Sequence, residues 1–121
     1  MSAHVDAATA VREIADVAPK LAALTNEVVF GDVWERPGLS QRDRSLITIA
    51  ALVALYRTEQ LPGHLRRALD NGLTRDEIAE AITHLAFYAG WPNAFTAITL
   101  AKSVFDLAQT ANGEASCRST M

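Results

Sequence analysis

The sequence predicts an all-α protein, a single-domain helical bundle of about six helices. No stretch of four or more residues alternates apolar and polar side chains as a half-buried strand does. Apolar residues instead recur at helical spacing, with Ser, Thr, Pro and Gly where helices begin and end. The 121 residues fit one domain, and half of them are hydrophobic. We therefore expect one copy to leave apolar surface exposed, which self-association covers.

The first helical segments are short. Residues 6–18 carry an apolar stripe at helical spacing, and Pro19 restarts the chain as a second helix. Gly31 is expected to end that helix. The loop 31–39 is rich in turn-forming residues and also contains Trp34, which we expect to be its buried anchor.

The central helix begins after Ser40, the predicted N-cap, with Asp43 in the capping-box position. It runs to about Tyr56 and is apolar nearly all round, so we expect it to be the central buried element. Pro62 suits the first turn of the next helix, and the Asn-Gly pair at 71–72 suits its C-terminal end.

Two longer helices follow. Thr74 and Glu77 form a capping box at the start of the first, and Gly90 ends it. Pro92 lies in the first turn of the last helix, which we expect to reach about Ala111. The predicted organisation is a helical extension, one main domain and a disordered tail: residues 1–20, 21–108 and 109–121.

Charge and hydropathy exclude several classes of protein. A net charge of −3 and a pI near 5.5 argue against a general nucleic-acid binder. The longest apolar run, 46–56, is shorter than the roughly 20 residues of a bilayer span. The N-terminus lacks the pattern of a secretory signal, so we expect a cytoplasmic protein. Cys117 has no partner in the chain for a disulfide or a CxxC pair.

The chain has no dinucleotide, P-loop, zinc-protease or nucleophile-elbow motif, so we expect scattered polar groups to carry any chemistry. His64 titrates near neutrality and suits proton transfer, although a hydrogen-bonded structural histidine is the alternative. His84 and Tyr88 share a helix face and offer a second donor and a phenol; the alternative is packing under the 90–92 corner. Glu80 and His84 are too few ligands for a metal, and none is expected.

Arginines greatly outnumber lysines, and their guanidinium groups suit bidentate binding of carboxylates. Arg44 and Arg57 flank the apolar helix and are the candidates for this role, against ordinary surface ion pairs. Trp34 and Trp91 are candidates for the wall of a substrate site, although core or interface anchoring is the commoner role.

Several segments in order resemble the carboxymuconolactone decarboxylase family, over a match from about Leu21 to Phe105. The segments that carry the resemblance are residues 31–40, 44–51, 64–74 and 88–94. The resemblance implies an alkylhydroperoxidase D-like helical fold that assembles as trimers or hexamers, with sites between helices near subunit contacts.

The family contains two chemistries. The peroxidase branch uses a CxxC pair, a histidine four residues later and an upstream glutamate. Aligned on His64, these positions hold Arg57, Gln60 and Ser45, so no thiol remains to reduce a peroxide. The sequence resembles the cysteine-free decarboxylase branch, which has Arg-Ser at the positions of 44–45.

This resemblance implies a cofactor-independent enzyme that converts a 4-carboxymuconolactone-like acid to an enol-lactone with loss of carbon dioxide. His64 would transfer the proton, and Arg44 and Arg57 would bind carboxylate. The implied donors in the pocket are Ser45, Gln60, His84 and Tyr88. An acidic residue is common in this branch at position 60, whereas here the acid is Glu59. Isomerisation or cyclisation of another substrate, and non-catalytic binding of a small acid or a partner, stay open as alternatives.

Overall fold

The computed structural model describes the backbone of residues 7–119 and the side chains of residues 8–111. Within this range it contains helices and turns and no strand, which confirms the predicted all-α class. The elements, including a π-helical turn η1 and a 3₁₀ turn η2, are α1 (Ala7–Ile14), α2 (Pro19–Leu24), η1 (Thr25–Phe30), η2 (Val33–Glu35), α3 (Gln41–Ala54), α4 (Leu61–Asp70), α5 (Arg75–Ala89) and α6 (Trp91–Ser119).

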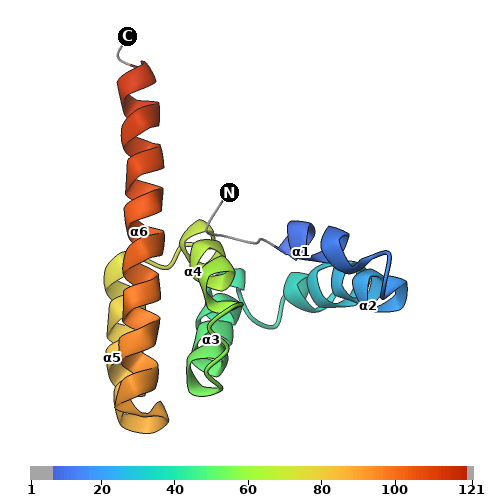
Figure 1. The fold of residues 1–121 in the computed structure, drawn as a ribbon, viewed down its shortest axis with the longest axis horizontal. Coiled ribbons are helices and arrows are strands. Elements are labelled where there is room, and N and C mark those ends of the chain that lie inside the picture. The colour runs from blue at the N-terminus through green and yellow to red at the C-terminus, as the bar shows by residue number, and fades with distance from the viewer. Residues whose placement is uncertain (1–6, 120–121) are drawn as a thin grey trace.

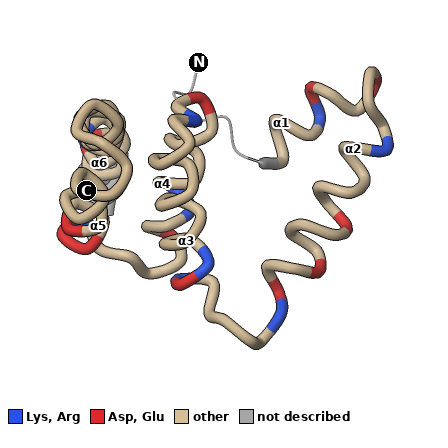
Figure 2. The backbone as a smooth tube through the Cα atoms, turned by 90° about the horizontal axis from the view of Figure 1, so that it is seen from below, with Lys and Arg blue, Asp and Glu red and all other residues tan. Residues whose placement is uncertain are grey.

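The helices form three groups (Figure 1). α5 and α6 make an antiparallel hairpin at one side, and α3 and α4 make a second hairpin in the middle. α1, α2 and η1 form an arm that stands to the other side of α3 and α4, and a view from below shows the same separation (Figure 2). The arm joins the bundle mainly through η2, which packs against α3.

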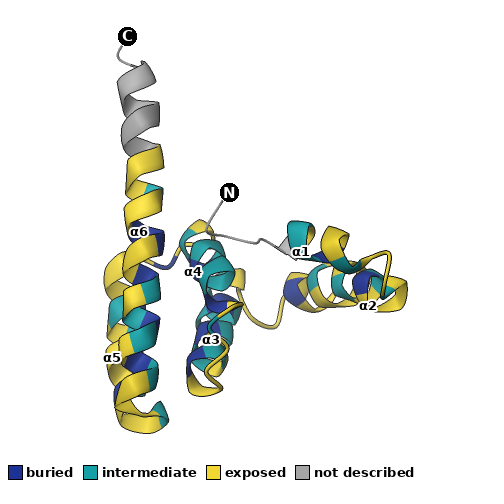
Figure 3. Cartoon of the chain, in the orientation of Figure 1, coloured by how far each residue is buried: buried dark blue, intermediate teal, exposed yellow. Residues whose placement is uncertain are grey.

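The hydrophobic core lies between the two hairpins, where α3 and α4 face α5 and α6 (Figure 3). Large side chains from three of these helices are completely buried there: Ile49, Leu65 and Ile78. Burying a side chain of this size stabilises the fold by about 1.5–3 kcal/mol. α6 packs through small residues, and Ala97 and Ala101 let its backbone approach α4 and α5 closely.

The predicted helix ends are confirmed where a local hydrogen bond or a positive φ defines them. The Ser40 hydroxyl accepts a hydrogen bond from the Asp43 backbone N–H at 3.0 Å. Thr74 and Glu77 form both bonds of the capping box, each at 3.0 Å. α5 ends at Gly90, whose φ of 106° lies in a region that side chains with a Cβ rarely adopt.

Three expectations about helix extent need correction. α1 ends at Ile14, and 15–17 form a turn in which the Val17 and Ala18 backbone N–H groups both donate to the Ile14 carbonyl. Pro19 disfavours a helical conformation at Ala18, so the helix does not continue through it. α3 ends at Ala54 instead of Tyr56, which adopts a positive φ of 58°. α6 is helical to Ser119, through most of the predicted tail. No proline interrupts that segment, and each added residue gains one helical hydrogen bond. Residues 120 and 121 lie outside the described residues.

α3 is also less buried than its composition predicted. Ser45, Ile49 and Val53 face the core, whereas Ile47 is 56% exposed. The reason lies in the tertiary structure. α4, α5 and α6 cover part of the α3 surface, whereas on the side of the arm it is mainly the short η2 turn that packs against α3. None of the described helices is both long enough and apolar enough to cross a membrane.

Candidate functional site

The most unusual grouping of side chains lies where the arm meets α4. The Trp34 indole is buried and stacks on the His64 ring, with centroids 6.2 Å apart and planes inclined by 25°. Phe30 also stacks on Trp34, with centroids 5.8 Å apart and planes inclined by 29°. The Arg67 guanidinium lies 4.2 Å from the Phe30 centroid and 5.5 Å from the Trp34 centroid. We call these four residues the Trp34 cluster.

Local structure explains why this cluster forms. His64 and Arg67 are three residues apart on α4 and therefore share a face. The turn that carries Trp34 is tied to the start of α3 by two side chains. Gln41 donates from Nε2 to the Trp34 carbonyl at 3.5 Å, and Arg44 donates from Nη2 to the Arg36 carbonyl at 3.1 Å.

Two polar atoms here have no hydrogen-bond partner within residues 8–111, although both are buried: His64 Nδ1 and Arg44 Nε. Buried polar atoms are nearly always paired in folded proteins, so an unpaired ring nitrogen near the start of α4 and an unpaired guanidinium nitrogen near the start of α3 are informative. They are the groups that a polar ligand would satisfy.

The electrostatics of His64 follow from its surroundings. Burial lowers the pKa of its imidazole below the ordinary value of 6.5, and the nearby positive charge of Arg67 lowers it further. The ring is therefore predominantly neutral at neutral pH. A negative charge placed against Arg67 would offset the second effect and favour the protonated ring.

Sequence reasoning missed Phe30 and Arg67. The signal for Arg67 was present, because a residue three positions after His64 on a helix shares its face. Phe30 gave no such signal, since its contacts with Trp34 and Arg67 depend on the path of the turn between η1 and η2.

Ser45 is placed differently from a pocket donor. Its side chain is almost fully buried, and its hydroxyl accepts a hydrogen bond from Asn71 Nδ2 at 2.9 Å. This bond joins α3 to the end of α4. This hydrogen bond accounts for the burial of Ser45 by a structural role, without a role in substrate binding.

Arg57 and Gln60 lie in the exposed connection between α3 and α4. The Arg57 backbone N–H donates to the Leu52 carbonyl at 2.8 Å, which closes the end of α3. Gln60 precedes α4, one turn before His64, and its side chain does not cap the helix. Both residues are thus near the α4 end that carries His64, but within the described residues no hydrogen bond, ion pair or ring contact joins either side chain to the Trp34 cluster.

His84, Tyr88 and Trp91 form a separate, exposed group. The rings of His84 and Tyr88 stack at 4.8 Å on α5, and Trp91 contacts Phe87 edge-on at 5.4 Å. In the part of the chain that the structure describes, no hydrogen bond, ion pair or ring contact joins His84 to His64. Within one copy of the chain, the two histidines predicted to act together therefore belong to separate groups of side chains. Trp91 is 55% exposed and is not a core residue.

Residues 8–111 contain no group of three His, Cys, Asp or Glu side chains that could hold a metal ion. An apolar groove of about 150 Å³ lies between α5 and α6, beside Trp91 and Phe95.

Comparison with known proteins identifies the family. The family model described as the carboxymuconolactone decarboxylase family matches residues 19–103. The chain is 49% identical over 76 residues to a 4-carboxymuconolactone decarboxylase of Acinetobacter baylyi, a match that covers 63% of this chain and 57% of that protein. It is 39% identical over 85 residues to a nitrosuccinic acid decarboxylase of Metarhizium robertsii, covering 69% and 59% of the two chains.

A third relative is an uncharacterised 15.0 kDa protein of Paracoccus denitrificans, 33% identical over 96 residues, which are 78% of this chain and 72% of that one. The matches to the two decarboxylases span less than two thirds of their lengths. The family match extends from α2 well into α6, so it includes the whole Trp34 cluster. The chain belongs to the carboxymuconolactone decarboxylase family.

Proposed function

We propose that this protein is a cofactor-independent acid–base enzyme that decarboxylates a lactone or a related small carboxylic acid. The observation that carries the proposal is the position of His64, a half-buried imidazole that stacks on Trp34, lies in the positive field of Arg67 and has one unpartnered ring nitrogen. The names of two relatives, a 4-carboxymuconolactone decarboxylase and a nitrosuccinic acid decarboxylase, support the reaction class.

The chemistry makes few demands on the protein. The bond between a carbon and its carboxylate breaks, carbon dioxide leaves, and the electron pair stays on the substrate. A conjugated lactone carbonyl, or a nitro group, accepts that pair, so the substrate is its own electron sink. One proton must then reach carbon. The protein has to hold the carboxylate, stabilise the developing negative charge and deliver the proton.

His64 is the proposed proton donor. Its pKa is below the ordinary value in the free protein, so the ring enters the reaction mostly neutral. A substrate anion paired with Arg67 offsets the positive charge that Arg67 places near His64, and so raises the pKa of the imidazole. Substrate binding therefore favours uptake of the proton that carbon later receives.

Arg44 and Arg67 are the proposed anion-binding residues. Arg44 keeps a buried Nε without a partner in the described residues, and its Nη2 bond to the Arg36 carbonyl fixes the guanidinium. Arg67 lies over two aromatic rings. It replaces Arg57 in this role, because the Arg57 side chain is exposed in the connection between the helices.

The first experiment is a cofactor-free assay of the purified protein with 4-carboxymuconolactone and, separately, with nitrosuccinic acid, following substrate loss and carbon dioxide. We expect turnover with carbon dioxide release, and a loss of about 100- to 10,000-fold in kcat for His64→Ala. Thr83→Ala, a surface change on α5, is the control.

Each other outcome has a definite meaning. Loss of the lactone without carbon dioxide would contradict decarboxylation and favour isomerisation or cyclisation. A folded protein that turns over neither acid would reject these substrates, and full activity in His64→Ala would reject the proton donor. His84→Ala decides whether the exposed histidine takes part, and we expect no loss, because it lies apart from His64 within one copy.

Self-association is also part of the proposal. Four aromatic side chains are largely exposed along the α5–α6 hairpin: Phe87, Tyr88, Trp91 and Phe95. Exposed apolar area of this kind is typical of an interface. We expect light scattering to give the mass of a trimer or a hexamer, and a monomer at micromolar concentration would contradict this.

A further inference from the structure

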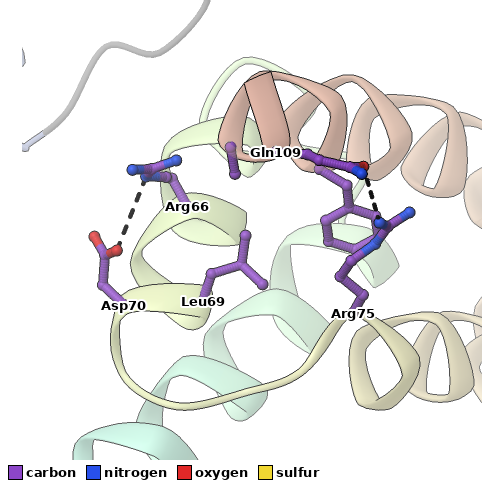
Figure 4. A pocket seen from close by; sticks show the side chains of 7 residues that line it. Arg66, Leu69, Asp70, Arg75 and Gln109 are labelled. Carbon is purple, nitrogen blue, oxygen red and sulfur yellow. Dashed lines mark hydrogen bonds and ion pairs between the residues drawn. The ribbon is translucent and has the colours of Figure 1, made fainter. Parts of the chain in front are cut away.

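A cavity of about 390 Å³ lies between α4, the start of α5 and α6 (Figure 4). It includes none of the Trp34 cluster, so nothing in the proposed reaction uses it. Its volume falls within the range of small-molecule sites. Its residues are of two kinds, apolar at the base and charged at the rim.

The apolar part is made by Leu69 on α4 and by Phe105 and Ala108 on α6. Phe105 is buried, and it faces the Arg75 guanidinium, which lies 5.1 Å from the ring centroid. Gln109 accepts a hydrogen bond from Arg75 Nη1 at 3.4 Å, and this contact holds the guanidinium at the rim (Figure 4). Arg75 forms no ion pair with a carboxylate in the described part of the chain.

The second guanidinium belongs to Arg66 on α4. Its Nε lies 3.9 Å from the nearer carboxylate oxygen of Asp70, at the limit of an ion pair, and both side chains are substantially exposed. Such an exposed ion pair is weak and leaves most N–H donors of the Arg66 guanidinium free. The rim thus carries two positive charges against one negative charge, which favours an anion.

We propose that this cavity binds a small organic acid, with its apolar body against Leu69 and Phe105 and its carboxylate on Arg66 and Arg75. Planar guanidinium groups suit carboxylates because two parallel N–H donors match the two oxygens. The apolar base favours an acid with a ring or a short hydrocarbon body over inorganic anions. The site is independent of the Trp34 cluster, since α4 presents Arg67 to that cluster and Arg66 to the cavity.

The test is a titration of the ¹⁵N-labelled protein with benzoate, followed by amide chemical shifts. Benzamide, which has the same shape and no charge, is the ligand control. We expect saturable benzoate shifts at Leu69, Arg75, Phe105 and Gln109, and no matching shifts with benzamide. Arg66→Gln and Arg75→Gln should each weaken the affinity by about ten-fold or more.

Lys102→Gln removes the same charge from the exposed side of α6, where Lys102 pairs with Asp106, and should leave the affinity unchanged. His64→Ala should also leave it unchanged, which separates this site from the proposed active site. Shifts confined to Trp34 and His64 would overturn the proposal. So would equal binding of benzamide, or benzoate affinity that neither arginine variant reduces.

Discussion

The imidazole of His64 lies against the indole of Trp34, with ring centroids 6.2 Å apart and an angle of 25° between the planes. The two residues come from different parts of the fold, one from α4 and the other from the η2 turn that joins the arm to the bundle. The contact buries the histidine and fixes the arm against the bundle. Three of the predictions that follow concern residues in or beside this contact.

Replacing the indole should change the titration of the histidine. Burial is the largest cause of the lowered pKa of His64, so in Trp34→Ala we expect that pKa to rise toward its ordinary value of 6.5. The pKa is measured from the pH dependence of the His64 ring signals in NMR. Trp91→Ala, at an exposed tryptophan far along the chain, is the control. An unchanged pKa in Trp34→Ala would show that α3 and α4 alone bury the ring.

Two consecutive arginines should act differently on the same histidine. Arg67→Met removes the charge that is the second cause of the lowered pKa, so the pKa of His64 should rise. Arg66→Met removes an equal charge on the cavity side of α4 and should leave the pKa unaltered. The same NMR titration compares the two. Equal shifts would mean that net charge, and not the position of Arg67, controls the ring.

The pH dependence of stability should also depend on His64. Its pKa is lower in the folded protein than the unfolded value of 6.5, so the unfolded chain binds the proton more readily. The stabilising contribution of the neutral ring is therefore present above pH 6.5 and is lost as the pH falls through the folded pKa. We expect the urea midpoint to decrease from pH 7.5 to pH 5, and to decrease less in His64→Gln.

The matched control for that experiment is His84→Gln, which removes the other histidine of the described helices. Its urea midpoint should decrease with falling pH as much as that of the parent protein does. If His64→Gln and the parent show the same pH dependence, carboxylates and not His64 govern acid destabilisation.

The hydrogen bond between Ser45 and Asn71 should contribute to the free energy of unfolding. Ser45→Ala removes the hydroxyl that accepts from Asn71 Nδ2 and leaves that amide half-buried without its partner. We expect a decrease of about 1 kcal/mol in the free energy of unfolding, measured by urea denaturation. Thr48→Ala, a neighbouring α3 residue bonded only to its own helix, is the control. A fall in kcat/KM beyond the loss of folded protein would instead support a role in the pocket.

The capping box of α5 gives a prediction independent of the site. Thr74→Ala breaks its bond to the Glu77 backbone N–H and should cost about 1 kcal/mol of stability. Thr83→Ala, on the exposed face of the same helix, should cost less because it removes only a bond within the helix. Equal losses would show that side-chain volume, and not capping, sets the effect.

The sequence by itself determined the features that depend on contacts within one turn of helix. The Thr74–Glu77 box and the Ser40 cap each join residues three apart, and Pro19 and Gly90 restrict the backbone wherever they occur. These signals predicted where most helices begin and end. They also explain why the fold class, and the family match that depends on the same segments, were accessible without the structure.

Tertiary structure decided which side chains meet. The sequence could place His64 and His84 on helix faces, but only the tertiary packing half-buried His64 against Trp34 and left His84 exposed. The path of the turn after η1 brought Phe30 and Trp34 to Arg67. A small change in a helix crossing or a turn moves a side chain by several ångströms, whereas a cap depends only on its immediate neighbours. The secondary structure was therefore predictable here, and the composition of the candidate site was not.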